Sequence, residues 1–420
     1  MRVIVIGSGA REHVITAALL RDPSVQHVYV APGNAGIAQI AKCLPVDVSD
    51  ASAIADLAVD FDVDLVVVGP EVPLMAGAAN ELNARGIPCF GPTREAALIE
   101  GSKAFCKEVM AQAGIATALA HVCTNVTEAE SALDTFGSPY VVKDDGLAAG
   151  KGVVVTSDRS EALAHALNCF SVGGTVVIEE FLDGPEVSIF GISDGTTVIA
   201  LQPAQDFKRV GDNDEGPNTG GMGAYSPLPW LDESVVAEVT ERVLQPMADE
   251  MKRRGTPFVG VLYAGLAMTA RGIRVIEFNS RFGDPETQVV LSRLVTPLGQ
   301  FLYAAAKGQL KDFSTLVWHE GYAVNVVIAA QGYPAKPLLG TSISGVELAE
   351  ADPFITVFHA GTELVGGELV TSGGRVLSVT AQAPTLNQAR ERAYAGVAHI
   401  EIAGSHFRSD IARNACTTDS

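Results

Sequence analysis

The stretch Val275-Ile276-Glu277-Phe278-Asn279-Ser280-Arg281-Phe282-Gly283-Asp284-Pro285-Glu286-Thr287-Gln288 joins an apolar segment to a dense set of polar and charged side chains. Residues 274–279 have the pattern of a β-strand, in which side chains point alternately to the two faces. Glu277 and Asn279 would therefore share a face. Such oxygen donors suit Mg²⁺ held against phosphate oxygens. A surface loop with incidental charges is the less favoured alternative, and we infer that the chain is an enzyme.

The composition limits the possible classes of protein. The chain has 420 residues, 47% of them apolar, which is more than one hydrophobic core usually covers, so we expect two to four domains. The formal net charge of −20 argues against a protein that binds a nucleic-acid backbone, because such proteins need a basic surface. We therefore expect no nucleic-acid partner, and any affinity for phosphate groups must be local.

The sequence also lacks the features of export and membrane insertion. A strand-like segment, 1–6, stands where a signal peptide would have its basic leader and apolar core, and no apolar run reaches transmembrane length. The cysteines form no C-x-x-C pair and have no histidine at zinc-ligand spacing; they are Cys43, Cys89, Cys106, Cys123, Cys169 and Cys416. These features predict a cytoplasmic protein with structural thiols and no membrane partner.

The first hundred residues alternate strand-like and helix-like segments. The predicted strands are 3–6, 28–30, 65–68 and 89–90, and the predicted helices begin near residue 11 and cover about 51–59 and 76–85. Strands that alternate with helices indicate a parallel, doubly wound sheet. Wholly apolar strands such as 65–68 suit burial on both faces of such a sheet.

A second unit starts near residue 100, where Ser102 can cap a helix over 103–113. The pattern then predicts strands at 140–143, 152–156 and 175–179, a helix at 233–254, and a hairpin of 262–269 with 273–279. From about 322 it predicts strands at 323–330 and 375–382 and a helix at 386–400. The polar segment 205–227 has no periodicity and predicts a long loop that closes over reactants, with a plain surface excursion as the alternative.

Two glycine-rich segments predict anion sites. Gly7-Ser8-Gly9-Ala10-Arg11-Glu12-His13 follows the first strand and opens a helix, whose free N–H groups favour an anion; a tight packing turn is the alternative. A dinucleotide fingerprint would require glycine in place of Glu12, so a nicotinamide dehydrogenase is disfavoured. In 141–153, Lys143 and Lys151 flank a small-residue loop that can approach phosphate oxygens, with a solvated hairpin as the alternative.

The strand predicted at 175–179 ends in carboxylates. Glu179 and Glu180 close the apolar run, and Glu186 follows a few residues later. The backbone here could bond an adenine while a carboxylate holds ribose hydroxyls. Solvent-facing glutamates at a strand end are equally common, so this segment alone does not decide between the two.

Together these segments closely resemble the phosphoribosylamine–glycine ligase family, the glycinamide ribonucleotide synthetases, of the ATP-grasp superfamily. The resemblance is collinear from residue 1 to at least residue 300. The segments that carry it are 7–13, 31–36, 68–73, 90–93, 101–103, 145–153, 179–184, 216–227 and 281–288. The last two are highly specific to this family.

The resemblance implies an α/β and α+β multidomain fold. A Rossmann-like N-terminal domain with a parallel sheet would cover 1–101. An ATP-grasp domain would cover 102–321, with a mobile lid at about 117–192, and a small C-terminal α+β domain would cover 322–420. We expect a monomer with a single activity.

The resemblance also implies a reaction. ATP would phosphorylate the carboxylate of glycine, and the amine of 5-phosphoribosylamine would attack the acyl phosphate. The products would be glycinamide ribonucleotide, ADP and phosphate, in de novo purine nucleotide biosynthesis. ATP and Mg²⁺ (or Mn²⁺) are the implied cofactors, and glycine and 5-phosphoribosylamine are the implied small-molecule partners.

The family's functional residues transfer to matching positions of this chain. The implied ATP-binding residues are Lys103, Lys143, Gly146, Gly150, Lys151, Glu179, Glu180, Phe181, Leu182 and Glu186. The implied metal ligands are Glu277 and Asn279. The implied substrate-binding residues are Gly9, Ala10, Arg11, Glu12, Asn34, Glu71, Asp206, Lys208, Arg281 and Asp284. Arg281, Lys143 and Asp206 are the predicted catalytic residues, with Arg281 on the glycyl carboxylate or the acyl phosphate.

The chain departs from the family pattern at Asp144, Phe207 and Ser280, where alanine, histidine and cysteine are more usual. The segment 262–269 offers no second carboxylate for the metal. The nearest alternative is an ATP-grasp carboxylase or formate-dependent transferase, which would respond to bicarbonate or formate instead of glycine. A noncatalytic nucleotide-binding regulator is another alternative, but it should have lost Glu277, Asn279 or the lysines.

Overall fold

The computed structural model describes residues 1–147 and 152–416, and it opens with a parallel sheet. The strands are β1 (Arg2–Gly7), β2 (His27–Pro32), β3 (Lys42–Cys43), β4 (Leu65–Val68) and β5 (Cys89–Phe90), in the order β3-β2-β1-β4-β5. Every pairing is parallel, which confirms the doubly wound sheet predicted from the alternation of strands and helices. Apolar clusters cover both of its faces.

Short helices connect these strands. They are α1 (Ala10–Leu20), α2 (Ile37–Ile40), α3 (Ala51–Asp60), α4 (Glu71–Ala76), α5 (Ala78–Ala84) and α6 (Arg94–Gly101). The helix predicted near 76–85 is confirmed as α5, and α4, which the sequence did not predict, precedes it across Gly77. This glycine has φ of 90°, a left-handed conformation that ends one helix and begins the next, and a Cβ there would meet the Arg94 guanidinium.

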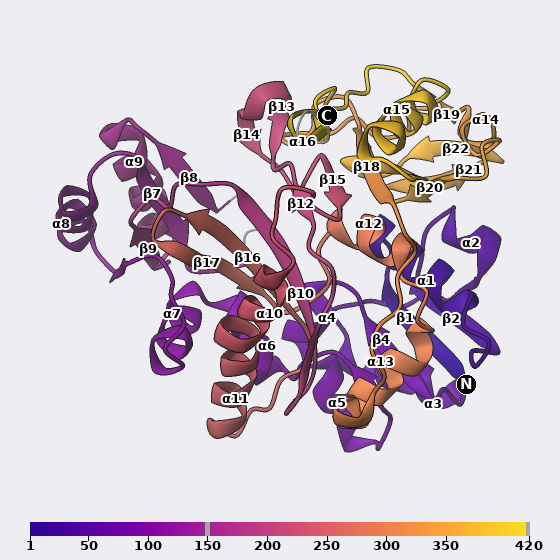
Figure 1. Ribbon diagram of the computed structural model, residues 1–420, viewed down its shortest axis with the longest axis horizontal. Coiled ribbons are helices and arrows are strands. Elements are labelled where there is room, and N and C mark those ends of the chain that lie inside the picture. The colour runs from indigo at the N-terminus through magenta and orange to yellow at the C-terminus, as the bar shows by residue number, and fades with distance from the viewer. Residues whose placement is uncertain (148–151, 417–420) are drawn as a thin grey trace.

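Helix α7 (Lys103–Gln112) begins at Ser102, whose side chain accepts a hydrogen bond from Phe105 N, so the predicted cap is confirmed. A small antiparallel sheet follows, in the order β6-β9-β7-β8. Its strands are β6 (Ala120–Cys123), β7 (Tyr140–Asp144), β8 (Val153–Thr156) and β9 (Val176–Glu179), with helices α8 (Val126–Phe136) and α9 (Arg159–Ser171). This unit has its own apolar core and stands out at the left of Figure 1.

A second antiparallel sheet has the order β11-β10-β16-β17. Its strands are β10 (Glu186–Asp194), β11 (Val198–Ala200), β16 (Val259–Thr269) and β17 (Gly272–Asn279). The predicted hairpin is confirmed, and a register shift interrupts it between Gly265 and Leu266.

The helix predicted over 233–254 forms as α10 (Ser234–Val239), a π-helical turn (Thr240–Leu244) and α11 (Gln245–Arg253). Helices α12 (Glu286–Arg293) and α13 (Leu298–Ala306) and a 3₁₀ turn (Leu310–Asp312) follow.

The segment 205–227 is not the loop without secondary structure that the sequence predicts. It contains β12 (Gln205–Asp206), β13 (Arg209–Gly211), a 3₁₀ turn (Asp212–Asp214), β14 (Glu215–Asn218) and β15 (Gly223–Ser226). Strands β13 and β14 form a hairpin, whereas β12 and β15 pair at one edge of the C-terminal sheet. Strands this short leave no visible periodicity, and β15 pairs with a strand about a hundred residues later in the chain.

The C-terminal sheet has the order β12-β15-β18-β23-β20. Its later strands are β18 (Tyr322–Ala329), β20 (Ile355–His359) and β23 (Arg375–Ala383), and α15 (Leu386–Val397) packs on β18 and β23. The remaining elements are β19 (Ile343–Ser344), α14 (Val346–Ala349), β21 (Thr362–Val365), β22 (Glu368–Thr371), β24 (Glu401–Ile402) and α16 (Arg413–Cys416). In Figure 1 this yellow region lies above the indigo N-terminal sheet. No helix in the described ranges is long and apolar enough to cross a membrane.

Candidate active site

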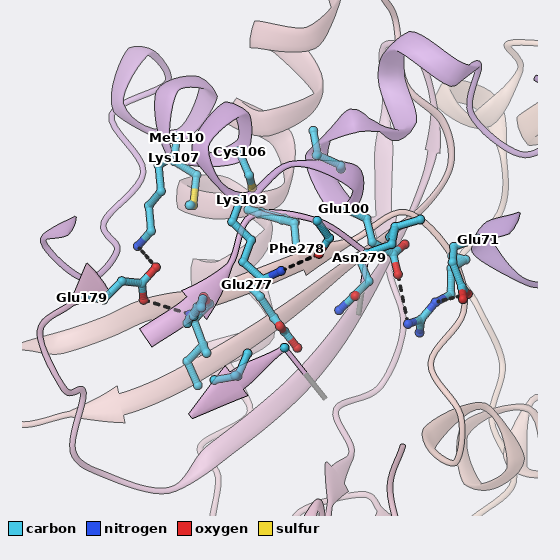
Figure 2. A pocket seen from close by; sticks show the side chains of 18 residues that line it. Glu71, Glu100, Lys103, Cys106, Lys107, Met110, Glu179, Glu277, Phe278 and Asn279 are labelled. Atoms are coloured by element: carbon cyan, nitrogen blue, oxygen red, sulfur yellow. Dashed lines mark hydrogen bonds and ion pairs between the residues drawn. The ribbon is translucent and has the colours of Figure 1, made fainter. Parts of the chain in front are cut away.

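A cavity lies where helices α6 and α7, the small sheet β6-β9-β7-β8 and strand β17 meet (Figure 2). Its charged and polar lining residues are Glu71, Glu100, Lys103, Lys107, Lys143, Glu179, Glu277, Asn279 and Arg281. Gly146 and apolar side chains, including Ile99, Met110 and Phe278, complete the wall. The structure therefore brings together predicted residues from three distant parts of the sequence. It adds Glu100 and Lys107, which the sequence did not single out.

Glu277 and Asn279 end strand β17 on the same face, as their spacing predicts. Burial alone would raise the pKa of Glu277, but Lys208, Lys143 and Lys103 outweigh burial, and its pKa is lowered. An ionised carboxylate beside an amide oxygen is a donor set that fits Mg²⁺. In the described part of the chain no three acidic, histidine or cysteine side chains group as metal ligands, so an ion held here would also need ligands from outside the protein, such as water or phosphate oxygens.

Lys103 holds the glycine-rich loop against helix α7. Its Nζ donates to the carbonyl oxygens of Asp144 at 2.6 Å and Gly146 at 3.0 Å. The Asp145 carboxylate accepts hydrogen bonds from Ala104 N and Ser102 Oγ at the start of α7. Burial and Lys143 lower the pKa of Lys103, whereas Glu277 opposes the shift. Gly150 and Lys151, which the resemblance places in this loop, lie outside the described residues.

Lys143 lies inside the cavity, where its Nζ is 2.8 Å from Glu179 Oε2 and donates to the Ile276 carbonyl at 3.0 Å. The other oxygen of Glu179 is 3.0 Å from Lys107 Nζ. Figure 2 shows Lys107 reaching down from α7 to this carboxylate. Glu179 is therefore shared by two lysines. Glu179 lines the cavity and its side chain faces cations of the protein, while its contact with ATP stays a prediction.

The segment after β9 lies outside the lining of the cavity. The Glu180 carboxylate accepts from Leu119 N and pairs with Arg271 at 3.0 Å, and Phe181 is 44% exposed. Leu182 is half-buried. Glu186, predicted to hold ribose, instead pairs with Lys208 at 2.6 Å. In this structure the carboxylates of Glu180 and Glu186 are thus engaged with side chains of the protein.

Arg281 is anchored by carboxylates from the N-terminal sheet region. Its Nη2 is 3.0 Å from Glu100 Oε1, and its Nε is 3.6 Å from Glu71 Oε2. Glu100 also accepts from both Ser280 N and Ser280 Oγ. Burial opposes the charge, but Glu100 and Glu71 outweigh it and raise the pKa of Arg281. Its buried Nε faces Glu71 without a hydrogen bond in the described ranges, and its Nη1 donates to the Phe282 carbonyl at 3.2 Å.

The residues predicted for phosphoribosylamine lie at the start of α1, beside the loop that follows β17. Arg11 donates to the Phe282 carbonyl at 2.9 Å and to Glu12 Oε1 at 2.6 Å. The Glu12 carboxylate accepts from Gly9 N at 2.6 Å, which uses one N–H group of the helix start. A Cβ on Gly9 would lie 3.5 Å from an Asp284 oxygen, so a larger residue would narrow this space.

Two other predicted substrate residues lie at the margins of this region. Ala10 is buried in α1. Asn34 donates to the backbone carbonyls of Ser8 and His359 and accepts from Gly36 N and Ile37 N. The Asn34 side chain therefore links the N-terminal sheet to the C-terminal sheet, and its contact with substrate stays a prediction.

Asp206 and Lys208 form a third group of predicted residues, on and just after β12. The Asp206 side chain is 7% exposed and lies 3.9 Å from Lys208 Nζ. Burial raises the pKa of Asp206 to about 7, with Lys208 opposing the shift and Glu286 and Glu186 adding to it. A buried triad that the sequence missed lies nearby: Tyr263 OH donates to Glu286 Oε1, and Ser188 Oγ contacts both.

Comparisons with known proteins agree with this geometry. Sequence models of the phosphoribosylglycinamide synthetase N domain, ATP-grasp (A) domain and C domain match residues 1–100, 101–287 and 323–414. A phosphoribosylamine–glycine ligase of Streptomyces coelicolor is 59% identical over 417 residues, covering 99% of each chain. One of Mycobacterium tuberculosis is 54% identical over 98% of this chain and 97% of its own.

Solved structures are similar as well. The phosphoribosylamine–glycine ligase of Thermotoga maritima has a TM-score of 0.84 at 31% identity, covering 98% of this chain and all of its own. A biotin carboxylase domain of Hydrogenobacter thermophilus 2-oxoglutarate carboxylase has a TM-score of 0.71 at 19% identity, covering 97% of this chain and 91% of its own, and shows a shared fold alone. The N-terminal parallel sheet, ATP-grasp unit and C-terminal α+β unit form the predicted multidomain fold, and the chain belongs to the phosphoribosylglycinamide synthetase family.

Proposed function

We propose that this chain catalyses the ATP-dependent ligation of glycine to 5-phosphoribosylamine in purine nucleotide biosynthesis. A glycine carboxylate oxygen takes the γ-phosphoryl group of ATP, and ADP leaves. The amine nitrogen of phosphoribosylamine then attacks the acyl carbon, phosphate departs with the phosphorylated oxygen, and the amide of glycinamide ribonucleotide forms. The observation that carries the proposal is the 59% identity, over nearly the whole chain, to a phosphoribosylamine–glycine ligase.

ATP is proposed to bind in the cavity under the lid. Lys103 and Lys143 face its interior and supply positive charge for phosphates, with Gly146 allowing close backbone approach. The backbone of 180–182 would meet the adenine, and Glu186 the ribose, after Lys208 releases that carboxylate. Mg²⁺, or Mn²⁺, held by Glu277 and Asn279 would offset the charge on the phosphates.

Glycine is proposed to bind with its carboxylate near Arg281. Arg281 lines the cavity, and Glu100 and Glu71 hold its guanidinium in place. A fixed cation beside the carboxylate stabilises the charge that develops during phosphoryl transfer. Arg281 would therefore contact the glycyl carboxylate first and the acyl phosphate afterwards.

Phosphoribosylamine is proposed to bind at the start of α1, next to the same loop. Its predicted contacts are Gly9, Ala10, Arg11, Glu12 and Asn34, and the predicted substrate residues Glu71 and Asp284 belong to the same region. Arg11 donates a hydrogen bond to the Phe282 carbonyl, so it lies beside the loop that carries Arg281. The amine of phosphoribosylamine and the acyl group of glycyl phosphate would meet at this loop. Asp206, which can gain or lose a proton near neutral pH, is the proposed acceptor of the amine proton, with Lys208 beside it.

The domain limits belong to the same proposal: 1–101, 102–321 with a lid at about 117–192, and 322–420. We also propose that the protein acts as a cytoplasmic monomer. Sedimentation at working concentration would check the oligomeric state, since a dimer would double the mass.

Release of ADP from Mg-ATP and freshly generated phosphoribosylamine tests the function. We expect ADP release to require glycine, with glycinamide ribonucleotide formed in equal amount. Bicarbonate and formate, compared at matched concentrations, should give background rates. ADP release triggered by bicarbonate or formate but not by glycine would reject the substrate assignment and leave only the ATP-grasp fold.

A further inference from the structure

Lys107 is a buried cation of the cavity that has no role in the function proposed above. It lies on α7, one helical turn after Lys103, and its side chain is 13% exposed. Its three donor positions are filled: Nζ donates to Thr117 Oγ1 and to the Ala118 carbonyl, each at 2.9 Å, and lies 3.0 Å from Glu179 Oε1. A surface lysine would not be desolvated and fixed in this way.

These contacts join segments that frame the nucleotide cavity. Thr117 and Ala118 lead into the lid sheet, and Glu179 ends strand β9 of that sheet. Thr117 Oγ1 also donates to the Val275 carbonyl at 2.6 Å, and Val275 lies on the strand that carries Glu277. Lys107 thus links the lid, helix α7 and, through Thr117, the strand of the proposed metal ligands.

The charges of the group give Lys107 a second effect. Glu179 is only 4% exposed, and its two oxygens meet Lys107 and Lys143 separately. With Lys143 alone, the carboxylate would form a neutral pair, and the phosphate-binding lysine would have little net charge to offer. With Lys107 present, the three side chains carry one net positive charge inside a cavity shielded from water, where charge acts strongly.

The partners of Lys143 fix the direction in which its third N–H group points. Its Nζ bonds the Ile276 carbonyl and Glu179 Oε2, which leaves one N–H group of the ammonium for another acceptor. Lys143 and Glu179 are buried and both bonds are short, so the ammonium has little freedom to turn. The orientation of Lys143 therefore depends on Glu179, and the position of Glu179 depends on Lys107.

We propose that Lys107 is a positioning residue for the nucleotide: it holds Glu179 and offsets its charge, so that Lys143 presents a net positive charge to a phosphate of ATP. In this proposal Glu179 acts on the nucleotide through Lys143. The proposal rests on the nucleotide role given above to this cavity. A purely structural role would require only that Lys107 hold these segments together. The proposal instead makes nucleotide affinity depend on the charge of Lys107.

Four variants distinguish the electrostatic role of Lys107 from a purely structural one. They are Lys107→Met, Lys107→Arg, Glu179→Gln, and the double variant Lys107→Met with Glu179→Gln. The dissociation constant of a nonhydrolysable Mg-ATP analogue is measured by calorimetry, and the KM values for ATP and glycine by steady-state kinetics. We expect Lys107→Met to weaken nucleotide binding by about tenfold, the effect of one lost charge interaction. The KM for glycine should stay within about twofold, because Arg281 is untouched.

The double variant is the decisive one. With Lys107 and Glu179 both replaced by neutral residues, no carboxylate offsets the positive charge of Lys143. Nucleotide affinity should therefore be higher than in Lys107→Met and closer to the wild-type value. A brace without an electrostatic role predicts instead that the double variant binds no better than the single one. Lys107→Arg, which keeps the charge, should bind nucleotide within about threefold of wild type.

Folding and the proposed function are checked separately. Circular dichroism and thermal unfolding identify a variant that has lost its fold, and Lys107→Gln, which keeps a neutral donor, then replaces Lys107→Met. Because analogue binding needs no turnover, wild-type binding without glycine-dependent ADP release would reject the ligase assignment and leave the Lys107 test valid. Unchanged nucleotide affinity in a folded Lys107→Met or Lys107→Gln variant would overturn the positioning role.

Discussion

At the scale of single residues, the cavity is organised by the balance of its charges. Glu277 is buried among Lys103, Lys143, Lys208 and Arg281, and these cations lower its pKa. Such a group is ionised above its depressed pKa, so it is ready to bind a metal at neutral pH. The same cations would face the phosphates of a bound nucleotide, and the metal would join the two.

Replacing Glu277 tests this arrangement. Glu277→Ala should lower kcat by about a hundredfold or more, because a metal ligand that stabilises the transition state is lost. The melting temperature should change little, since within residues 1–147 and 152–416 the carboxylate makes no hydrogen bond that holds β17. Glycine-dependent ADP release and thermal unfolding give the two readouts, with Glu363→Ala on the exposed β21 as a control. A kcat near that of the wild type would reject the metal assignment.

Arg281 should not tolerate its nearest substitute. Arg281→Lys keeps the charge but loses the planar guanidinium, which contacts Glu100 and Glu71 through different nitrogens. We expect kcat/KM for glycine to fall by about tenfold to a hundredfold, with a smaller change in the KM for ATP. Steady-state kinetics with each substrate varied in turn measure this. Arg242→Lys, at an exposed ion pair of α10 and the following turn, provides the matched control. Equal kcat/KM values for the two variants would exclude Arg281 from the glycine site.

At the scale of elements, the C-terminal segment fixes the hairpin that follows the predicted active-site strand β12. Arg408 is 1% exposed, forms two bonds with Asp410 and one with Asp214, and lies over the Phe207 ring at 4.9 Å. Phe207 stands between Asp206 and Lys208. The phenylalanine at this position is therefore part of a packing contact with a cation, which gives a physical reason for the departure from histidine.

Arg408→Met should destabilise the protein by about 3–5 kcal/mol, because it leaves the nearly buried carboxylate of Asp410 without its partner. Urea unfolding measures the change in the free energy of unfolding. Arg242→Met, which removes an exposed pair, should stay within about 0.5 kcal/mol. If both variants lost the same small amount, the Arg408 cluster would have no more effect than a surface ion pair.

The regular elements of the fold could be predicted from the sequence, whereas the contacts between distant segments could not. Alternation of apolar strands and helices predicts the N-terminal sheet, and strand spacing places Glu277 and Asn279 on one face. No sequence motif singles out Glu100 or Lys107, because each acquires its role from a residue many positions away. Glu100 pairs with Arg281, and Lys107 pairs with Glu179. The segment 205–227 was mistaken for a loop because its strands depend on partners in the C-terminal sheet.

At the scale of the whole molecule, a buried histidine pair joins the N-terminal and C-terminal sheets. His13 Nδ1 accepts a hydrogen bond from His359 N at 2.9 Å, and Asn34 donates to the His359 carbonyl at 2.8 Å. Burial lowers the pKa of His13 to about 3, with His359 adding to the shift, and burial lowers that of His359 to about 4. Both side chains are therefore neutral in the folded protein well below pH 6.

This pair should make the protein sensitive to mild acid. Histidine in an unfolded chain has a pKa of about 6.5, so below that pH the two histidines bind protons in the unfolded chain but stay neutral in the folded protein. The free energy of unfolding therefore falls as the pH drops. Each histidine can contribute a slope of up to about 1.4 kcal/mol per pH unit between about pH 6 and pH 5. Urea unfolding of wild type and His13→Asn, which keeps an acceptor, should show a shallower slope in the variant.

The exposed His27 provides the control, because His27→Asn should leave the slope unchanged. Identical slopes for wild type and His13→Asn would mean that His13 is not held neutral at the interface.

The central claim of the account is that the carboxylate of glycine is phosphorylated before the amide forms. Glycine labelled with ¹⁸O in its carboxylate, supplied with Mg-ATP and phosphoribosylamine, tests it directly by mass spectrometry of the released phosphate. The account predicts that each phosphate carries one labelled oxygen, because the C–O bond of the acyl phosphate breaks when the amine attacks. Unlabelled phosphate, released in step with glycinamide ribonucleotide, would contradict the acyl phosphate route.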